Sequence, residues 1–255
     1  MRIDILTLFT DAFESPLRCS ILGRARERGR VTVNVVDIRD FATDKHKVTD
    51  DAPYGGGPGM VLKPEPIFLA VESLKEVNSL ENIILLSPQG RTFNQEIARE
   101  LALKEDMVLI CGRYEGVDDR VRLGLIMDEI SIGDYVLSGG EIPALAVVDA
   151  VSRLVSGVVG DEASVVTDSF YKGLLGFPQY TRPRSFRGMN VPDVLLSGNH
   201  KTIEKWRVKE AFKRTLQRRP DLVRNVKVGR NELALLEEAK AELDVEAIRG
   251  ETGTE

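Results

Sequence analysis

Residue types that build metal centres and disulfide frameworks are scarce in this chain of 255 residues. It has only two cysteines and two histidines, and its cysteines do not form the CxxC spacing of zinc and redox sites. We therefore expect no zinc site. We also expect both thiols, Cys19 and Cys111, to stay reduced, as is typical of a cytoplasmic protein.

Long apolar runs are missing as well, since no window approaches the ~20 apolar residues of a membrane-spanning helix. The first residues, Met1–Leu6, have the pattern of a strand and lack the regions of a signal peptide. We therefore expect no membrane association and a cytoplasmic location. With 42% hydrophobic residues, the chain is long enough to bury a substantial core in one or two domains.

The phosphate-binding patterns GxGxxG and GxxxxGK[ST] do not occur, which argues against a dinucleotide cofactor or a nucleoside triphosphate. Three other glycine-containing loops follow apolar runs, at Leu86–Gly90, Cys111–Gly116 and Ile132–Gly140. Glycine lets backbone groups approach a ligand closely, and loops at the carboxyl ends of strands bind small molecules in open α/β sheets. Such loops suit a nucleoside held by backbone groups and shape. The alternative is a set of tight turns without a ligand.

Charge is unevenly distributed, although the net charge is only −5. Residues 1–181 hold 19 Lys and Arg against 28 Asp and Glu, residues 182–230 hold 14 against 4, and residues 231–255 hold 2 against 8. The middle segment, at +10 in an acidic protein, is a candidate surface for phosphate groups. The alternative is a solvated helix face, which a charge of so nearly one sign does not favour.

Strand and helix patterns alternate through the first two-thirds of the chain. We expect strands at residues 3–9, 31–38, 83–86, 107–111 and 129–132, and helices near 16–28, 65–75, 94–103, 117–125 and 141–155. This alternation predicts a mostly parallel sheet covered on both faces. The stretch Asp50–Met60 is too rich in Gly and Pro to form an element, so it predicts a surface loop.

The last third is different. Residues 157–169 are small, polar and acidic, which predicts a linker. Apolar residues at helical spacing predict one helix over Leu195–Gln217 and another from about Asn231 to Ile248. We expect an α/β domain at 1–156, a mobile linker at 157–170, and a small, basic, α-helical domain with an acidic tail at 171–255.

Six phrases of the sequence together resemble a known family. They are DAPYGGGPGM, LSPQG, CGRYEGVDDR, SIGDYVLSGGE, DSFYKGLLGFPQYTRP and LLSGNH. Their order and spacing, from Met1 to about Asp221, resemble those of the bacterial tRNA (guanine-N1)-methyltransferase, or TrmD, family. Each phrase alone is weak, whereas the whole set is specific.

The resemblance implies a trefoil-knotted α/β domain of the SPOUT class that works as a homodimer. Composition and periodicity do not indicate a knot, and knots are essentially absent from protein folds in general. The resemblance also implies that the knot loops hold S-adenosylmethionine in a bent conformation. The implied contacts are Leu86, Ser87, Pro88, Gln89, Gly90, Gly112, Tyr114, Glu115, Gly116, Ile132, Gly133, Tyr135, Val136, Leu137, Gly139, Gly140 and Pro143.

The implied substrate is the guanosine immediately 3′ of the tRNA anticodon, at tRNA position 37, methylated on N1. Asp168 aligns with the general base of the family and Arg153 with its catalytic arginine. A carboxylate could remove the N1 proton, and a cation near O6 could stabilise the charge that develops there. The alternatives are a helix N-cap or linker carboxylate for Asp168, and a surface salt bridge to Asp149 for Arg153.

Because Asp168 lies in the predicted linker, a linker that is mobile without RNA would delay catalysis until tRNA orders it. In the implied homodimer, the site would combine the cofactor loops of one subunit with Asp168 of the other.

RNA recognition is expected mainly in the basic domain, helped by the loop that begins at Asp50. The candidate tRNA contacts are Asp50, Tyr54, Arg182, Arg184, Arg187, His200, Lys201, Lys205 and Lys209, with Lys213 and Arg214 beside them. Trp206 falls in the helical apolar stripe, which favours a core residue over a base-stacking one. The resemblance also implies a need for magnesium, but the sequence offers no ligand cluster for it.

Two other functions compete with this interpretation. One is a knotted methyltransferase that acts on a ribose 2′-OH or another RNA, against which the pair Arg153 and Asp168 and the DAPYGGGPGM loop argue. The other is an RNA-binding module without catalysis, which the intact cofactor loops disfavour.

Overall fold

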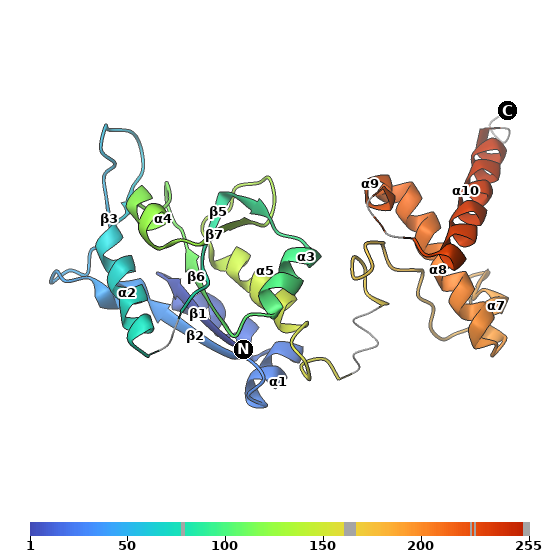
Figure 1. Cartoon of the computed structure of the whole chain (residues 1–255), viewed down its shortest axis with the longest axis horizontal. Coiled ribbons are helices and arrows are strands. Elements are labelled where there is room, and N and C mark those ends of the chain that lie inside the picture. Colours follow the sequence, from blue (N-terminus) through green and yellow to red (C-terminus); the bar gives the residue numbers. More distant parts are fainter. Residues whose placement is uncertain (78–79, 161–166, 225, 227, 252–255) are drawn as a thin grey trace. The chain divides into compact units, whose positions relative to one another are not determined.

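The computed structural model describes residues 1–77, 80–160, 167–224, 226 and 228–251. The chain divides into two compact units, Met1–Glu162 and Ala163–Glu255 (Figure 1). The division falls inside the predicted linker, of which residues 161–166 lie outside the described residues.

A five-stranded sheet forms the centre of the first unit. Its strands are β1 (Arg2–Thr7), β2 (Thr32–Asp37), β5 (Ile83–Thr92), β6 (Asp106–Cys111) and β7 (Asp128–Ser131). They lie in the order β2-β1-β6-β5-β7, and every neighbouring pair is parallel. The prediction of an α/β fold with a mostly parallel sheet is confirmed.

Helices cover both faces of this sheet. They are α1 (Ser20–Glu27), α2 (Pro64–Val77), α3 (Gln95–Ala102), α4 (Asp119–Leu125) and α5 (Glu141–Ser152). Residues of α1, α3 and α5 share one buried cluster, and residues of α2 and α4 share another. The helix predicted at 16–28 is divided, because a 3-10 turn at Pro16–Arg18 precedes α1 and Ser20 has a positive φ of 52° that a right-handed helix does not allow.

Strand β6 supplies both cores. Met107, Leu109 and Cys111 enter one cluster and Val108 and Ile110 the other, and all five side chains are fully buried. Successive side chains of a strand point to opposite faces, so a strand buried on both sides has no polar positions. Each fully buried aliphatic side chain contributes about 1.5–3 kcal/mol, and these central strands therefore hold the loops at their carboxyl ends on a rigid base.

The predicted surface loop at Asp50–Met60 is largely present. Strands β3 (Asp50–Asp51) and β4 (Val61–Leu62) pair antiparallel, and the connection between them extends away from the sheet in Figure 1. We call residues 50–62 the arm. Its first two residues belong to a short strand, which the high Gly and Pro content of the stretch did not predict.

The second unit is helical with a small hairpin. Strands β8 (Ser185–Phe186) and β9 (Met189–Asn190) form the hairpin. The helices are α7 (Asp193–Leu196), α8 (His200–Arg218), α9 (Pro220–Val223) and α10 (Arg230–Glu251). The helix predicted over Leu195–Gln217 is therefore interrupted, and Asn199 begins α8 by accepting a hydrogen bond from the Thr202 backbone N–H.

The core of the second unit is small. Phe212 of α8 packs against Leu236 and Ala239 of α10, with several half-buried aliphatic side chains around them. Trp206 lies outside this cluster, half-buried, with its ring 6.4 Å from that of Tyr180. The described ends of the predicted linker are folded: Val158 is buried in the first unit, and Asp168 accepts a backbone hydrogen bond from Tyr171 in the second.

Candidate active site

A cavity of about 320 Å³ lies between a bulge inside β5 and the carboxyl ends of β6 and β7. Its walls come from the three glycine-containing segments singled out in the sequence. All of the predicted cofactor contacts line it except Gly90. The structure thus brings together residues that are as much as 57 positions apart, from Leu86 to Pro143.

The first segment is a bulge inside β5 and not, as predicted, a loop after the strand. Leu86 and Arg91 both pair with Ile130 of β7, so the four residues between them, Ser87–Gly90, leave the ladder. The first three of these line the cavity. Gly90 returns the chain to β7, and a Cβ atom there would lie 2.3 Å from the Ile130 nitrogen. Only glycine fits at this return point.

The second and third segments pack directly on each other. The Gly140 N–H donates to the Gly112 carbonyl over 2.9 Å, and Arg113 and Gly139 form an isolated antiparallel bridge. A Cβ atom on Gly140 would come within 2.6 Å of the Cys111 Cα, which is backbone and has no room to move. The two loops reach this separation because position 140 has no side chain.

A buried polar network supports the third segment. Arg113 donates to the Ser138 carbonyl over 2.8 Å, its Nε lies 3.5 Å from a Glu141 oxygen, and its guanidinium lies 4.1 Å from the centre of the Phe9 ring. Glu141 is only 6% exposed and accepts a hydrogen bond of 2.8 Å from the Thr7 hydroxyl. Buried charges need such partners, and these partners tie the third segment and the start of α5 to β1 and to the second segment.

Neither cysteine is set up for catalysis. Cys19 is exposed and Cys111 is fully buried, and both are free thiols. Burial, and secondarily the nearby Glu141 carboxylate, raise the pKa of the Cys111 thiol well above its usual value. The thiol therefore stays protonated, and a protonated thiol is a weak nucleophile.

The arm is fastened to the second segment. The Glu115 N–H donates to the Met60 carbonyl over 3.0 Å. Tyr54, near the tip of the arm, is fully exposed, whereas Asp50 at its base is half-buried. A predicted tRNA contact thus stands on a segment that is joined to the cavity wall by backbone hydrogen bonds.

Six polar residues that line the cavity were not among the predicted site residues. They are Arg113, Asp119, Arg122, Glu129, Ser131 and Ser138. Arg113 lies inside the phrase CGRYEGVDDR, and Ser131 and Ser138 lie inside SIGDYVLSGGE, so their position in these phrases was the available signal. Asp119 and Arg122 lie one turn apart at the start of α4 and form an ion pair of 2.7 Å, which local sequence does not distinguish from an ordinary surface pair.

The two candidate catalytic residues lie in different units. Arg153 directly follows α5 in the first unit and is half-buried, and its N–H donates to the Asp149 carbonyl. Asp168 is exposed in the second unit, in the turn that precedes Phe170.

Most of the predicted tRNA contacts in the second unit are exposed. Arg182, Arg184 and Arg187 lie in or beside the β8–β9 hairpin, and His200, Lys201 and Lys205 lie on the first turns of α8. Arg184 forms an exposed ion pair with Asp193. An exposed pair of this kind is weak, so it leaves the arginine available to a phosphate.

Lys209 differs from the other cations. It and Lys213 are half-buried, and both donate to the Glu242 carboxylate of α10. The hydrogen bond from Lys209, followed by that from Lys213, lowers the pKa of Glu242 below its ordinary value. These two lysines therefore hold α10 on α8, and Lys209 has less charge to offer to RNA than its neighbours do.

Within the described residues, no group of three or more His, Cys, Asp or Glu side chains is arranged to hold a metal ion. No helix in the described part of the chain is both long and apolar enough to cross a bilayer.

Comparison with known proteins identifies the family. Residues 1–225 match the family model described as tRNA (Guanine-1)-methyltransferase TrmD. The tRNA (guanine-N(1)-)-methyltransferase of Dictyoglomus turgidum is 57% identical over 243 residues, which cover 95% of this chain and 98% of the relative. The protein of the same name from Moorella thermoacetica is 55% identical over 240 residues, 93% of this chain and 96% of the relative.

The matches cover nearly the whole of this chain and of each relative, so the resemblance inferred from the six phrases is confirmed. A methyltransferase of this kind implies S-adenosylmethionine as the methyl donor. The chain belongs to the TrmD family of tRNA (guanine-1)-methyltransferases.

Proposed function

We propose that this protein transfers a methyl group from S-adenosylmethionine to N1 of the guanosine 3′ of the anticodon, at tRNA position 37. The observation that carries the proposal is the cavity between the β5 bulge and the ends of β6 and β7, which gathers all but one of the expected cofactor contacts from three separate segments. The activity named for the relatives, which align over nearly the whole chain, supports the same reaction.

The cavity suits this cofactor. Its volume of about 320 Å³ lies at the lower end of the range for small-molecule sites. Leu86, Ile132 and Leu137 offer apolar surface, glycine-rich backbone offers hydrogen bonds, and Glu115 offers negative charge to a cationic ligand. When bound, S-adenosylmethionine supplies a methyl group from a positively charged sulfur.

Asp168 and Arg153 would act on the guanine. The Asp168 carboxylate accepts the proton of N1, because N1 is a poor nucleophile until that proton leaves. This type of proton transfer contributes about 10²–10⁴-fold to a rate. The Arg153 guanidinium donates to O6, where negative charge develops, and a fixed donor at such a position contributes a few kcal/mol in a dry site.

We propose that the protein is a homodimer in which Asp168 of one subunit completes the cavity of the other. Val136 and Ile142, on the third segment and on α5, are 89% and 61% exposed, and exposed apolar side chains beside a site mark candidate interfaces. Mixing an Asp168→Ala variant with a Gly140→Val variant tests the shared site. Regained activity in the mixture supports it, whereas an inactive mixture of two folded, exchanging dimers opposes it.

We also propose the trefoil knot that the family resemblance implies. The packing of the third segment against the second, through Gly140 and Gly112, supports a chain that passes close under its own loop. Pulling the ends of the first unit apart should leave a chain shorter than about 3.3–3.6 Å per residue, because a knot tightens without opening. Full extension would contradict the knot.

The exposed cations of the hairpin and of α8 would meet tRNA phosphates, with the arm beside the target base. Phosphate contacts make affinity strongly dependent on salt. A base splayed out of the anticodon loop would reach the cavity.

The described residues give no set of ligands to which magnesium could be assigned. A tRNA-modifying role of this kind is consistent with a cytoplasmic location.

A transfer assay with two tRNA transcripts tests the proposal. One transcript carries guanosine after the anticodon, and the other carries adenosine there. Methyl label on the guanosine transcript alone, recovered as 1-methylguanosine, is the expected result. Label on both transcripts, or on a ribose 2′-oxygen, would replace the proposal with the ribose-methylating alternative.

A further inference from the structure

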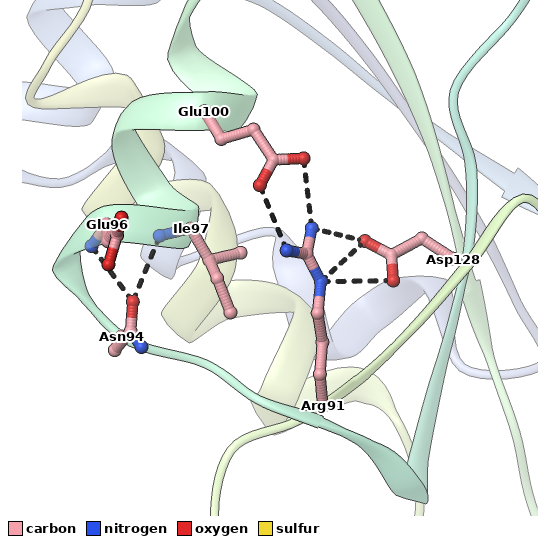
Figure 2. A network of polar contacts seen from close by, with 6 residues as sticks. All are labelled: Arg91, Asn94, Glu96, Ile97, Glu100 and Asp128. Atoms are coloured by element: carbon pink, nitrogen blue, oxygen red, sulfur yellow. Dashed lines mark hydrogen bonds and ion pairs between the residues drawn. The ribbon is translucent and has the colours of Figure 1, made fainter.

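Arg91 stands at the point where the bulge of β5 rejoins the sheet. It pairs with Ile130 of β7 directly after Gly90. Its guanidinium binds two carboxylates at once: the Nη atoms lie 2.9 and 3.1 Å from Glu100, and Nε and Nη2 lie 3.1 and 2.6 Å from Asp128 (Figure 2). We call these three residues the Arg91 clamp.

The clamp joins three elements. Arg91 belongs to β5, Glu100 lies in α3, and Asp128 is the first residue of β7. Figure 2 also shows Asn94 between the strand and the helix, where its side chain accepts hydrogen bonds from the backbone N–H groups of Glu96 and Ile97 in the first turn of α3. The helix start is therefore fixed by its cap, and the helix body is fixed to the strand by the clamp.

Electrostatics favours the charged form of this cluster. The hydrogen bonds to Glu100, and then those to Asp128, raise the pKa of Arg91. The hydrogen bonds from Arg91 lower the pKa of Glu100. A planar guanidinium that meets carboxylates through paired hydrogen bonds is more directional than a lysine ammonium, so the clamp sets a position as well as a charge.

The clamp does not touch the cofactor cavity. None of its three residues lines that cavity, and all three line a separate surface hollow of about 730 Å³. Any effect on the cofactor therefore passes through neighbouring backbone, either Ser87–Gly90 of the bulge or Glu129–Ser131 of β7, and the bulge is the part that Arg91 itself adjoins. Both ends of that bulge are fixed, but in different ways. Leu86 is held by burial in the core, whereas Arg91 is exposed and is held by the clamp and by its pairing with Ile130.

We propose that Arg91 is a positioning residue for S-adenosylmethionine, which fixes the far end of the bulge so that Ser87, Pro88 and Gln89 face the cavity before the cofactor arrives. The inference rests on the proposed cofactor site. Without the clamp the bulge must become ordered on binding, and ordering a loop at the moment of binding weakens affinity. The clamp itself is half-exposed, and exposed ion pairs contribute little to global stability.

Isothermal titration of S-adenosylhomocysteine into the full-length protein measures the affinity of the cofactor site without turnover. We expect Arg91→Ala to raise the dissociation constant about 5- to 10-fold. Arg91→Lys should retain only part of the affinity, because one ammonium cannot bind both carboxylates as the guanidinium does. Asp128→Asn should weaken binding more than Glu100→Gln, because Asp128 lies on the strand that the bulge rejoins.

Arg120→Ala is the matched control. Arg120 is also an exposed arginine bound to a carboxylate through two hydrogen bonds, but its partner, Asp118, is two residues away and joins no second element. Its removal should leave the dissociation constant unchanged. Steady-state kinetics should agree: Arg91→Ala raises KM for S-adenosylmethionine while kcat and KM for tRNA change little.

Two results separate failure of this inference from failure of the proposed function. Wild-type protein that does not bind S-adenosylhomocysteine would overturn the proposed cofactor site itself. Wild-type protein that binds it, with Arg91→Ala equally tight but less stable to heat, would make the clamp purely structural and overturn the positioning role. If Arg91→Ala fails to fold, the isosteric Asp128→Asn and Glu100→Gln variants decide, since equal affinity in both would also overturn it.

Discussion

The two units of this protein present different surfaces to their ligands. In the first unit, backbone of glycine-rich segments forms a cavity, and buried contacts such as Gly140 on Gly112 hold its walls. In the second unit, exposed arginines and lysines stand on a core of few residues, centred on Phe212. Ligand binding at the first surface should therefore weaken when a single methyl group is added to the protein, as in a glycine-to-alanine substitution, and should hardly depend on salt. Ligand binding at the second surface should depend on salt and tolerate single substitutions.

The largest expected effect separates binding from turnover. Asp168→Asn keeps the size of the side chain but removes its ability to take a proton. We expect kcat to fall about 10²–10⁴-fold while the dissociation constant of S-adenosylhomocysteine stays the same. Single-turnover methyl transfer, beside isothermal titration, checks both. Unchanged kcat would remove Asp168 from the role of general base.

The next effect tests how tightly the cavity is built. Gly140→Ala places a Cβ atom 2.6 Å from the Cys111 Cα, so the second and third segments must move apart. We expect the cofactor dissociation constant to rise at least about tenfold, because a shift of this size misplaces several backbone groups at once. Gly160→Ala is the control, since an added Cβ there meets nothing within 4 Å. Equal affinity in the two variants would show that the cavity tolerates expansion.

A smaller effect is expected for charges of the second unit. Replacing Arg184, Lys201 and Lys205 with alanine should weaken tRNA binding and flatten its dependence on salt by about 0.7–0.9 in the log–log slope per lost phosphate contact. Cofactor affinity should not change. Lys240→Ala, on α10 beside Glu237, is the control cation. Filter binding at several salt concentrations measures the slopes, and identical slopes in all proteins would move the RNA surface elsewhere.

The smallest effect concerns how the second unit is held together. Lys209 and Lys213 lower the pKa of Glu242 below its ordinary value of 4.5. This contact therefore stabilises the folded state fully at pH values above 4.5, and the stabilisation is lost as pH falls through the lowered pKa. Because Glu242 is 42% exposed, solvent screens the contact and Glu242→Gln should cost only about 0.5 kcal/mol near neutral pH.

Urea unfolding of the wild type and of the Glu242→Gln variant, at neutral pH and at a series of lower pH values, measures this difference in stability. It should shrink as pH falls, because protonation of the wild-type carboxylate removes the same charge that the substitution removes. Glu237→Gln, which loses one exposed pair on the same helix, should change stability less. A difference that grows as pH falls would contradict the assigned sign.

The order of elements could be predicted from local pattern, because β6 and its neighbours are short apolar runs between helices. Local pattern failed where distant segments decide the structure. Pro88 and Gly90 indicate the end of a strand, yet the strand resumes at Arg91 because Ile130 of β7 offers a partner. The break before α8 had a local signal, the sequence Ser197-Gly198-Asn199, which contains a good helix cap.

The site was predictable mainly through the family resemblance. Glycine-rich loops after strands indicated a ligand, but only the resemblance identified individual contacts. Neither the loops nor the resemblance predicted Arg113 and its partner Glu141, because their contact depends on how the second segment meets α5. The Arg91 clamp escaped for the same reason, because Glu100 and Asp128 are 9 and 37 residues away from Arg91 along the chain.

Hydrogen exchange of the full-length protein, with and without S-adenosylhomocysteine, tests most directly whether the three segments form one cofactor site. Backbone amides of residues 87–90, 112–116 and 132–140 should all exchange more slowly with the ligand, while those of α8 should not change. Protection of all three segments together is the result that this account predicts. Protection confined to one segment, or found in the second unit instead, would contradict it.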